Sequence, residues 1–149
     1  MPRIKRVFYD TWAWIEAGDD DSPIGRDLRK AYGPEGPAEI HTSVLALAEL
    51  AGRLSRLGKA ALAIQMTREI QGKHVVHGLE AEDIDGIARH HGRLHAHPAK
   101  ASLADTAMFC QAGRLRIPFI TADQAFEGEA ESVVPSKWRT AARKQRSVK

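Results

Sequence analysis

The chain has 149 residues, 43% of them hydrophobic, which is enough for one domain with a core and leaves no length for a second. Its single cysteine, Cys110, excludes an internal disulfide framework, and no apolar run approaches the roughly 20 residues of a membrane helix. The apolar stretch from Val7 to Tyr9 is too short for a signal-peptide core, so we expect a soluble, cytoplasmic protein that does not bind membranes.

The net charge of +3 conceals an uneven distribution of charge along the chain. Residues 136–149 contain six of the 22 Lys and Arg residues and no acid, which leaves 16 basic and 19 acidic residues elsewhere, a net of −3. We therefore divide the chain into a domain at 1–135 and a basic C-terminal tail at 136–149. The tail is either a solvated chain end or a surface for a polyanion. Its candidate RNA-binding residues are Lys137, Trp138, Arg139, Arg143 and Lys144.

The first half of the chain predicts two strands and four helices. Val7 to Tyr9 forms a short apolar run that ends at Asp10, and Gly18 stops the helix expected after it. Apolar residues at 47, 50, 51, 54 and 57 follow the 3.6-residue period of an amphipathic helix, which Gly58 ends. In chain order we expect a strand at 7–9, helices at 11–17 and 24–32, a strand at 39–43, and helices at 44–57 and 59–70.

The second half continues the alternation of strand and helix. We expect a strand at 73–77, helices at 81–92 and 102–112, and strands at 117–121 and 132–134, with Gly92 and Pro98 ending the first of these helices. This alternation predicts an α/β fold, a three-layer α/β/α sandwich around a parallel sheet of five strands.

Four acids lie at corresponding places in this pattern. Asp10 and Asp123 each follow an apolar strand, and Glu49 and Asp105 each lie in the first turns of a helix. Each has a plain structural explanation: a helix or turn cap for Asp10 and Asp123, an exposed ion pair with Arg53 for Glu49, and a capping box begun by Ser102 for Asp105.

Together the four acids suggest one site. The carboxyl ends of parallel strands meet along one edge of the sheet, so residues at those ends become neighbours. Two carboxylates about 5 Å apart repel each other by roughly 3 kcal/mol at an effective dielectric near 20, so such a cluster requires cations or raised pKa values. Oxygen ligands favour Mg²⁺ or Mn²⁺ over zinc.

The segments that carry these acids, at 7–11, 41–50, 102–107 and 119–123, resemble the four signature blocks of PIN domains. They occur in the order and at the spacing of that family, and the last two are the more specific. Many small stand-alone PIN proteins are VapC-type toxins, metal-dependent ribonucleases that are neutralised by an antitoxin. The chain departs from the pattern at Thr106, where the family often has alanine, and in its basic tail.

The resemblance implies a site and an activity. Asp10, Glu49, Asp105 and Asp123 would hold one or two Mg²⁺ or Mn²⁺ ions, and Thr11 and Thr121 would orient these ligands. The activity implied is endoribonucleolytic: a metal-activated water hydrolyses an RNA phosphodiester and leaves a 5′-phosphate and a 3′-hydroxyl. The implied partners are RNA, a cognate antitoxin and a second copy of the chain in a homodimer.

Three alternative functions remain open at this point. The first is a PIN nuclease of RNA processing that has no antitoxin. The second is a receiver-like phosphoacceptor domain, which Thr121 and Lys137 loosely imitate, although Tyr9 stands where a second acid would be needed. The third is a catalytically silent scaffold that binds RNA or protein, against which the mutual repulsion of four retained acids argues.

Other reactive residues have structural interpretations. His91 and His95 have helical i,i+4 spacing, but Gly92 follows His91 where a zinc protease requires glutamate, so we expect exposed, polar histidines. Cys110 is expected to be a small buried residue on the helix face that packs on the sheet. Trp12 and Trp14 belong either to the rim of the crevice or to the core.

Overall fold

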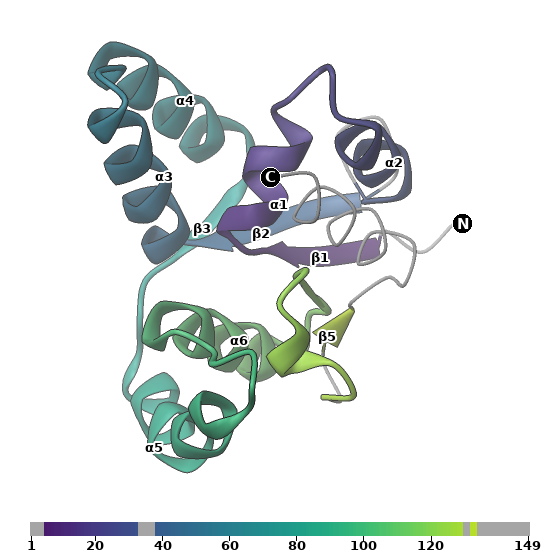
Figure 1. Ribbon diagram of the computed structural model, residues 1–149, viewed down its shortest axis with the longest axis vertical. Helices are drawn as coiled ribbons and strands as arrows, with labels where there is room; N and C mark the ends of the chain where they lie inside the picture. Colours follow the sequence, from purple (N-terminus) through teal and green to yellow (C-terminus); the bar gives the residue numbers. More distant parts are fainter. Residues whose placement is uncertain (1–4, 33–37, 130–131, 134–149) are drawn as a thin grey trace.

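The computed structural model describes residues 5–32, 38–129 and 132–133 (Figure 1). A parallel sheet of order β3-β2-β1-β4-β5 lies between two groups of helices. The predicted α/β/α class is confirmed. The strands are β1 (Lys5–Tyr9), β2 (Ala38–Ser43), β3 (Val75–His77), β4 (Phe119–Ile120) and β5 (Ser132–Val133). The helices are α1 (Thr11–Ala17), α2 (Pro23–Tyr32), α3 (Val44–Arg56), α4 (Ala60–Lys73), α5 (Ala81–Ala96) and α6 (Leu103–Leu115), with a short 3₁₀ helix η1 (Gln124–Phe126).

The central strand β1 is buried on both sides. Val7, Phe8 and Tyr9 all belong to the core, as expected of a parallel strand that helices cover on both faces. Phe8 is in register with His41 of β2 and with Phe119 of β4, so the three parallel strands end at about the same level. The carboxyl ends of these three strands therefore lie side by side.

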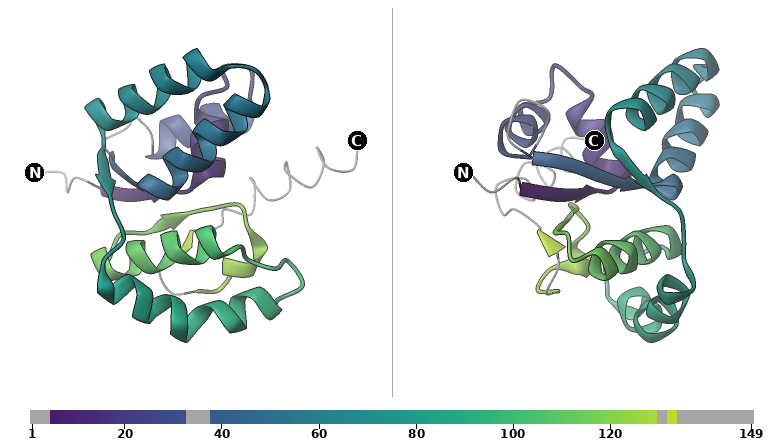
Figure 2. Two further views of the ribbon diagram at one scale, coloured as in Figure 1. Left: turned by 90° about the vertical axis from the view of Figure 1, so that its left-hand side faces the viewer. Right: turned by 180° about the vertical axis from the view of Figure 1, so that it is seen from behind.

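The path of the chain creates a crevice beside β1. From β1 the chain proceeds outward to β2 and β3, then returns across the sheet to β4 and β5. Because such crossovers are right-handed, α1 to α4 lie on one face and α5 and α6 on the other (Figures 1 and 2). The direction of winding reverses between β1 and β4, and ligands of open α/β sheets bind at the carboxyl ends of the strands at such a point.

The expected elements are present with small shifts at their ends, apart from one helix. The helix expected to end near Gly92 continues to Ala96 as α5. Leu94 is buried and prolongs the apolar face, a gain that outweighs the cost of about 1 kcal/mol for a glycine within a helix. Gly58 does end α3, with the positive φ of 75° that glycine adopts without strain.

Within the described ranges, no helix combines the length and the apolar character needed to span a bilayer. The predicted domain boundary at 135 and the basic tail at 136–149 lie outside the described residues.

Candidate active site

Asp10 lies directly after β1, and its side chain is only 3% exposed. Its Oδ1 accepts a hydrogen bond of 2.8 Å from the backbone N–H of Ala13 and so caps α1. Its own N–H donates to the carbonyl of Ile120 at 3.3 Å, which ties it to the end of β4. The cap expected from the sequence is therefore present, and the same residue lies at the crevice between β1 and β4.

Asp123 occupies the equivalent position after β4. Its Oδ1 accepts from the N–H of Ala125 at 2.9 Å and caps η1. The hydroxyl of Thr121 is fully buried and accepts from the N–H of Asp123 at 3.1 Å, and it also hydrogen-bonds the Asp10 carboxyl group. Thr121 thus links the two aspartates at adjacent strand ends.

Glu49 approaches the crevice from α3. The Thr11 hydroxyl donates a hydrogen bond of 2.8 Å to Oε1 of Glu49, which connects α3 to the start of α1. Among the described residues Glu49 makes no ion pair with Arg53, so the surface pair that the sequence offered as an alternative is not formed. The first turns of α3 therefore direct Glu49 toward the strand ends.

Asp105 is held at the start of α6. The hydroxyl of Ser102 accepts a hydrogen bond of 3.1 Å from the backbone N–H of Asp105, as the capping-box spacing predicts. The buried side chains of Thr106 and Ala107 pack the next positions of this helix into the fold. As a result the Asp105 carboxylate lies at the end of α6 that meets the carboxyl edge of the sheet.

The four acids line a single cavity of about 500 Å³. They reach it from four different parts of the chain: Asp10 after β1, Glu49 from α3, Asp105 from α6 and Asp123 after β4. The structure therefore brings together all four residues that the sequence nominated, along with Thr11. Their catalytic and metal-binding roles stay predictions.

The electrostatics show that these carboxylates interact. Burial raises the pKa of Asp10 to about 8, with further increases from the nearby charges of Asp105 and Asp123 and opposing hydrogen bonds from Thr121 and Ala13. Burial likewise raises the pKa of Asp105 to about 6, and the charges of Glu49 and Asp123 add to the shift. Asp105 thus interacts electrostatically with all three other acids. A cation bound in the cavity would reduce the repulsion among these carboxylates.

The donor set suits a hard cation. Asp10 and Asp123 each use Oδ1 in a cap and retain a second oxygen, and all four donors are carboxylates, the ligands preferred by Mg²⁺ and Mn²⁺. In the described part of the chain, however, no three Asp, Glu, His or Cys side chains are grouped closely enough to hold an ion as they stand. Binding would therefore draw the carboxylates together by side-chain rotation.

The cavity also contains residues that the sequence reasoning missed. Arg53 of α3, His97 and Gln124 contribute to its wall. The sequence suggests Arg53 only as an ion-pair partner for Glu49, and its i+4 spacing from that acid is the one signal that places it near the site. The two tryptophans separate: Trp12 lines the cavity, whereas Trp14 is in the core and donates from Nε1 to Thr42 at 2.9 Å.

The histidines of α5 are less exposed than expected. His91 is half-buried, and its Nδ1 lies 2.9 Å from the hydroxyl of Thr106, while His90 packs edge-on to Phe109 with ring centroids 6.0 Å apart. The departure from the family pattern at Thr106 therefore has a structural role, since this hydroxyl links α5 to α6. His95 is exposed, as predicted, and so is His97, which follows α5.

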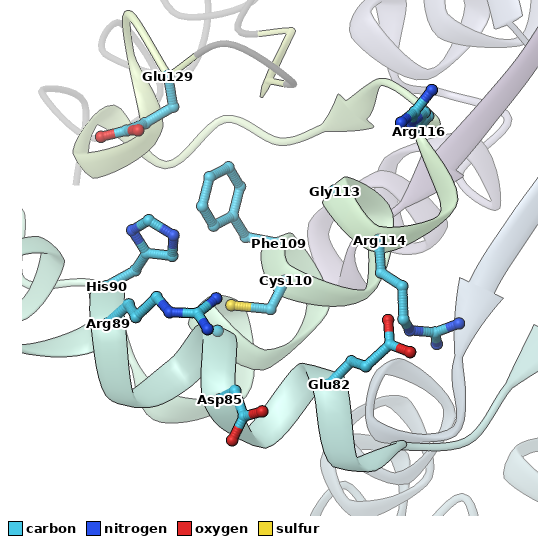
Figure 3. Close-up of a pocket in the computed structure, with 11 residues that line it drawn as sticks. Glu82, Asp85, Arg89, His90, Phe109, Cys110, Gly113, Arg114, Arg116 and Glu129 are labelled. Carbon is cyan, nitrogen blue, oxygen red and sulfur yellow. The ribbon is translucent and has the colours of Figure 1, made fainter.

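A second cavity, of about 590 Å³, lies between α5 and α6 and contains none of the four acids (Figure 3). Its lining mixes both signs of charge, with Asp85 and Glu129 as well as Arg89 and Arg116. Cys110 faces this cavity instead of the sheet, because the sulfur packs against Gly86 of α5, 3.0 Å from where a Cβ would stand. Burial, with a contribution from Asp83, raises the pKa of this thiol to about 11 and keeps it protonated.

Comparisons with known proteins bear on the fold. No family model matches the chain, and no curated protein matches it. A toxin–antitoxin complex from Klebsiella pneumoniae contains a chain that is similar at a TM-score of 0.64 and 16% identity, over 85% of this chain and 95% of that one. VapBC2 from Rickettsia felis, bound to a DNA fragment from its promoter, contains a chain that is similar at a TM-score of 0.65 and 14% identity, over 86% of this chain and 96% of that one.

The predicted PIN-like fold is confirmed. Because both identities are below 20%, this likeness concerns the path of the chain and carries over no residue or activity. In this PIN-like fold the strands β1 and β4 end at the cavity that Asp10 and Asp123 line. The tail residues nominated for RNA binding, Lys137, Trp138, Arg139, Arg143 and Lys144, lie outside the described residues.

Proposed function

We propose that this chain is a Mg²⁺- or Mn²⁺-dependent endoribonuclease and the toxin of a VapBC-type toxin–antitoxin pair. The observation that carries the proposal is the convergence of four carboxylates, two of them with raised pKa values, in one cavity at the carboxyl edge of a PIN-like sheet. A cluster of this kind destabilises the folded state, because each acid raises the electrostatic cost of ionising the others. Its presence therefore favours a functional role for the four acids.

The four acids would hold the cation. When bound, Mg²⁺ or Mn²⁺ lowers the pKa of a coordinated water and stabilises the negative charge that develops on the phosphate. Asp10 and Asp123 are positioned by their caps and by the Thr121 hydroxyl, which hydrogen-bonds the Asp10 carboxyl group and accepts from the backbone N–H of Asp123. The Thr11 hydroxyl positions Glu49 in the same way from the opposite side.

Protonation of the site would compete with the cation. In the metal-free protein a pKa of about 8 keeps Asp10 largely protonated at neutral pH, and Asp105, near 6, is partly so. A divalent ion would displace these protons, so its binding releases protons and strengthens as the pH rises. Activity limited by the cation is accordingly expected to increase from pH 6 to pH 8.

The decisive experiment is cleavage of single-stranded RNA with Mg²⁺, with Mn²⁺ and with EDTA. Wild-type protein should cleave only with a divalent ion, and Asp10→Asn and Asp105→Asn should each lose roughly 10²–10³-fold in rate, the scale of losing a main electrostatic contribution. Asp85→Asn on the exposed surface of α5 makes the same chemical change outside the cavity and serves as the matched control.

Two results would contradict the proposal. Full activity in EDTA would remove the metal from the mechanism, and activity in both site variants equal to that of Asp85→Asn would remove the carboxylates. A labile phosphoaspartate formed with acetyl phosphate would instead support the receiver alternative. RNA binding without cleavage under any of these conditions would support the scaffold.

The partner proposal rests on the structural neighbours, both of which come from toxin–antitoxin complexes. A cognate antitoxin would bind the chain and suppress RNA cleavage, and the chain itself would form a homodimer. Co-expression with the product of an adjacent small gene, followed by co-purification and the cleavage assay, tests the first point. Sedimentation of the isolated chain tests the second. A nuclease that no such product inhibits would belong to RNA processing instead.

A further inference from the structure

A third, smaller cavity adjoins the four-acid cavity along α3. It has a volume of about 320 Å³ and shares Thr11, Glu49 and Arg53 with the four-acid cavity. Beyond these shared residues it is lined by Ala48, Gly52 and Arg56. The two cavities together form a groove that begins at the carboxylates and runs along one side of this helix.

The groove follows one stripe of α3. Glu49, Gly52, Arg53 and Arg56 stand at i, i+3, i+4 and i+7, within roughly 100° of the helix circumference. The buried Leu47 and Leu50 lie on the opposite side. The stripe therefore changes from acidic at the carboxylate site to basic farther along the helix.

The two arginines are available to a ligand. Both are exposed, and across residues 5–32, 38–129 and 132–133 neither guanidinium has a hydrogen bond or ion pair. Side chains three positions apart on a helix have Cβ atoms roughly 5–6 Å apart, so Arg53 and Arg56 can contact consecutive phosphates of one strand. Arg53 is the pivotal residue, because it lines both cavities.

Gly52 leaves space between the arginines and the site. A Cβ at this position would meet no atom within 4 Å, and the backbone there is ordinary helix. A glycine within a helix costs about 1 kcal/mol relative to alanine, so neither packing nor local conformation accounts for it. The glycine leaves open space on this side of α3.

We propose that the groove over Gly52, Arg53 and Arg56 binds the sugar–phosphate backbone of the RNA next to the bond that is cut. This inference rests on the proposed function, because an acidic cavity repels RNA and requires a basic approach. The arginines attract the flanking phosphates while the carboxylates, with their cation, receive the phosphate to be cleaved. Arginine contacts of this kind act on binding and register, so they are positioning residues.

The test measures equilibrium binding of a short fluorescein-labelled single-stranded RNA to the full chain carrying Asp10→Asn, in Mg²⁺, as a function of salt. Arg53→Gln and Arg56→Gln should each weaken binding roughly three- to tenfold and lower the slope of log Kd against log salt by about 0.7. Arg68→Gln, an exposed arginine of α4 outside both cavities, is the matched control and should change neither value. Arg53→Lys and Arg56→Lys should preserve the slope.

A steric pair of variants separates blockage from unfolding. Gly52→Ala and Gly52→Leu should both raise the thermal stability of the helix, but only leucine fills the groove. Gly52→Leu should therefore lose RNA affinity by a factor similar to that of Arg53→Gln, and Gly52→Ala, with the smaller side chain, should lose much less. A protein that is more stable but binds RNA less well cannot be explained by damage to the fold.

The outcomes separate this inference from the proposed function. Absence of metal-dependent cleavage by the wild-type chain overturns the proposed function. If the wild type cleaves but the arginine variants bind like Arg68→Gln, only the inference about the groove is overturned. If the arginine variants lose affinity but Gly52→Leu binds RNA fully, the proposed path of the RNA backbone along α3 is overturned.

Discussion

Asp10, directly after β1, and Asp83, in the first turn of α5, are both buried, with exposures of 3% and 1%, yet their carboxylates have different partners. Asp83 receives two hydrogen bonds from Arg114, at 2.8 and 3.1 Å, and completes the capping box of α5. Asp10 has no cationic partner among the described residues and is surrounded by other acids. An arginine of the same chain thus neutralises the Asp83 carboxylate, whereas no described residue neutralises Asp10.

This contrast distinguishes structure from function. A buried carboxylate with a bidentate arginine satisfies its charge and its hydrogen bonds within the protein. A buried carboxylate without a cation must hold a proton or take a cation from solution, and the pKa of Asp10, raised to about 8, expresses that cost. The four-acid cavity is therefore the part of the molecule that an external ion can complete.

The largest effect is expected where the paired acid loses its partner. Arg114→Met should lower the free energy of unfolding by about 3 kcal/mol, because it strands the Asp83 charge in the interior. Urea denaturation measures the change. The control Arg89→Met removes an exposed arginine of α5 and should stay within about 0.5 kcal/mol of wild type. An equal effect in both variants would mean that Asp83 does not depend on Arg114.

The unpaired acid should respond with the opposite sign. Asp10→Asn retains a side-chain oxygen for the cap on α1, since Asn and Asp cap helices equally well. At pH 8.5 and without divalent ions it should stabilise the protein on the order of 2 kcal/mol, because the buried charge is removed.

The sign of this effect sets its pH dependence. The folded pKa of Asp10 lies above the ordinary value of 3.8, so the folded state holds the proton more tightly and wild-type stability falls as the pH rises from about 4 to 8. Asp105 adds to the fall between about pH 4 and 6. The advantage of Asp10→Asn should therefore vanish at pH 4, and urea titrations at both pH values measure it. A wild-type protein that is more stable at pH 8 than at pH 5 would contradict the view that Asp10, unlike Asp83, is buried without a cation.

A divalent ion should supply the cation that Asp10 lacks. Mn²⁺ or Mg²⁺ at about ten times its dissociation constant should stabilise the wild type by about 1.4 kcal/mol. Thermal unfolding with and without the ion detects this as a rise in Tm. Asp105→Asn should lose most of the rise, and Asp85→Asn should retain it. A rise that is the same in all three proteins would place the ion elsewhere.

The smallest expected effect concerns the neutral hydroxyl that positions Asp105. Ser102→Ala removes the cap of α6 and should cost about 1 kcal/mol in the free energy of unfolding. Ser102→Thr keeps a hydroxyl in the same place and should restore most of the loss. Chemical denaturation of both variants measures the difference, and an alanine variant as stable as the threonine variant would show that the cap contributes nothing.

Local sequence patterns predicted most elements of the fold because they depend on neighbouring residues. The start of α1 after Asp10, the cap at Ser102 and the end of α3 at Gly58 are each decided within a few positions. The continuation of α5 past Gly92 was missed, because the buried Leu94 that favours it makes its contacts with the rest of the fold. The position of Cys110 was missed for the same reason, since its neighbour Gly86 belongs to another helix.

The sequence by itself determined which residues reach the edge of the sheet, because a strand end or a helix start is a local property and parallel strands align their ends. It therefore nominated Asp10, Glu49, Asp105 and Asp123, and these four residues line one cavity. Only the tertiary structure decided which buried acids have a cation. Arg114 is 31 residues from Asp83 and pairs with it, whereas Arg53 follows Glu49 by only one helical turn and does not, because tertiary packing decides which charges meet.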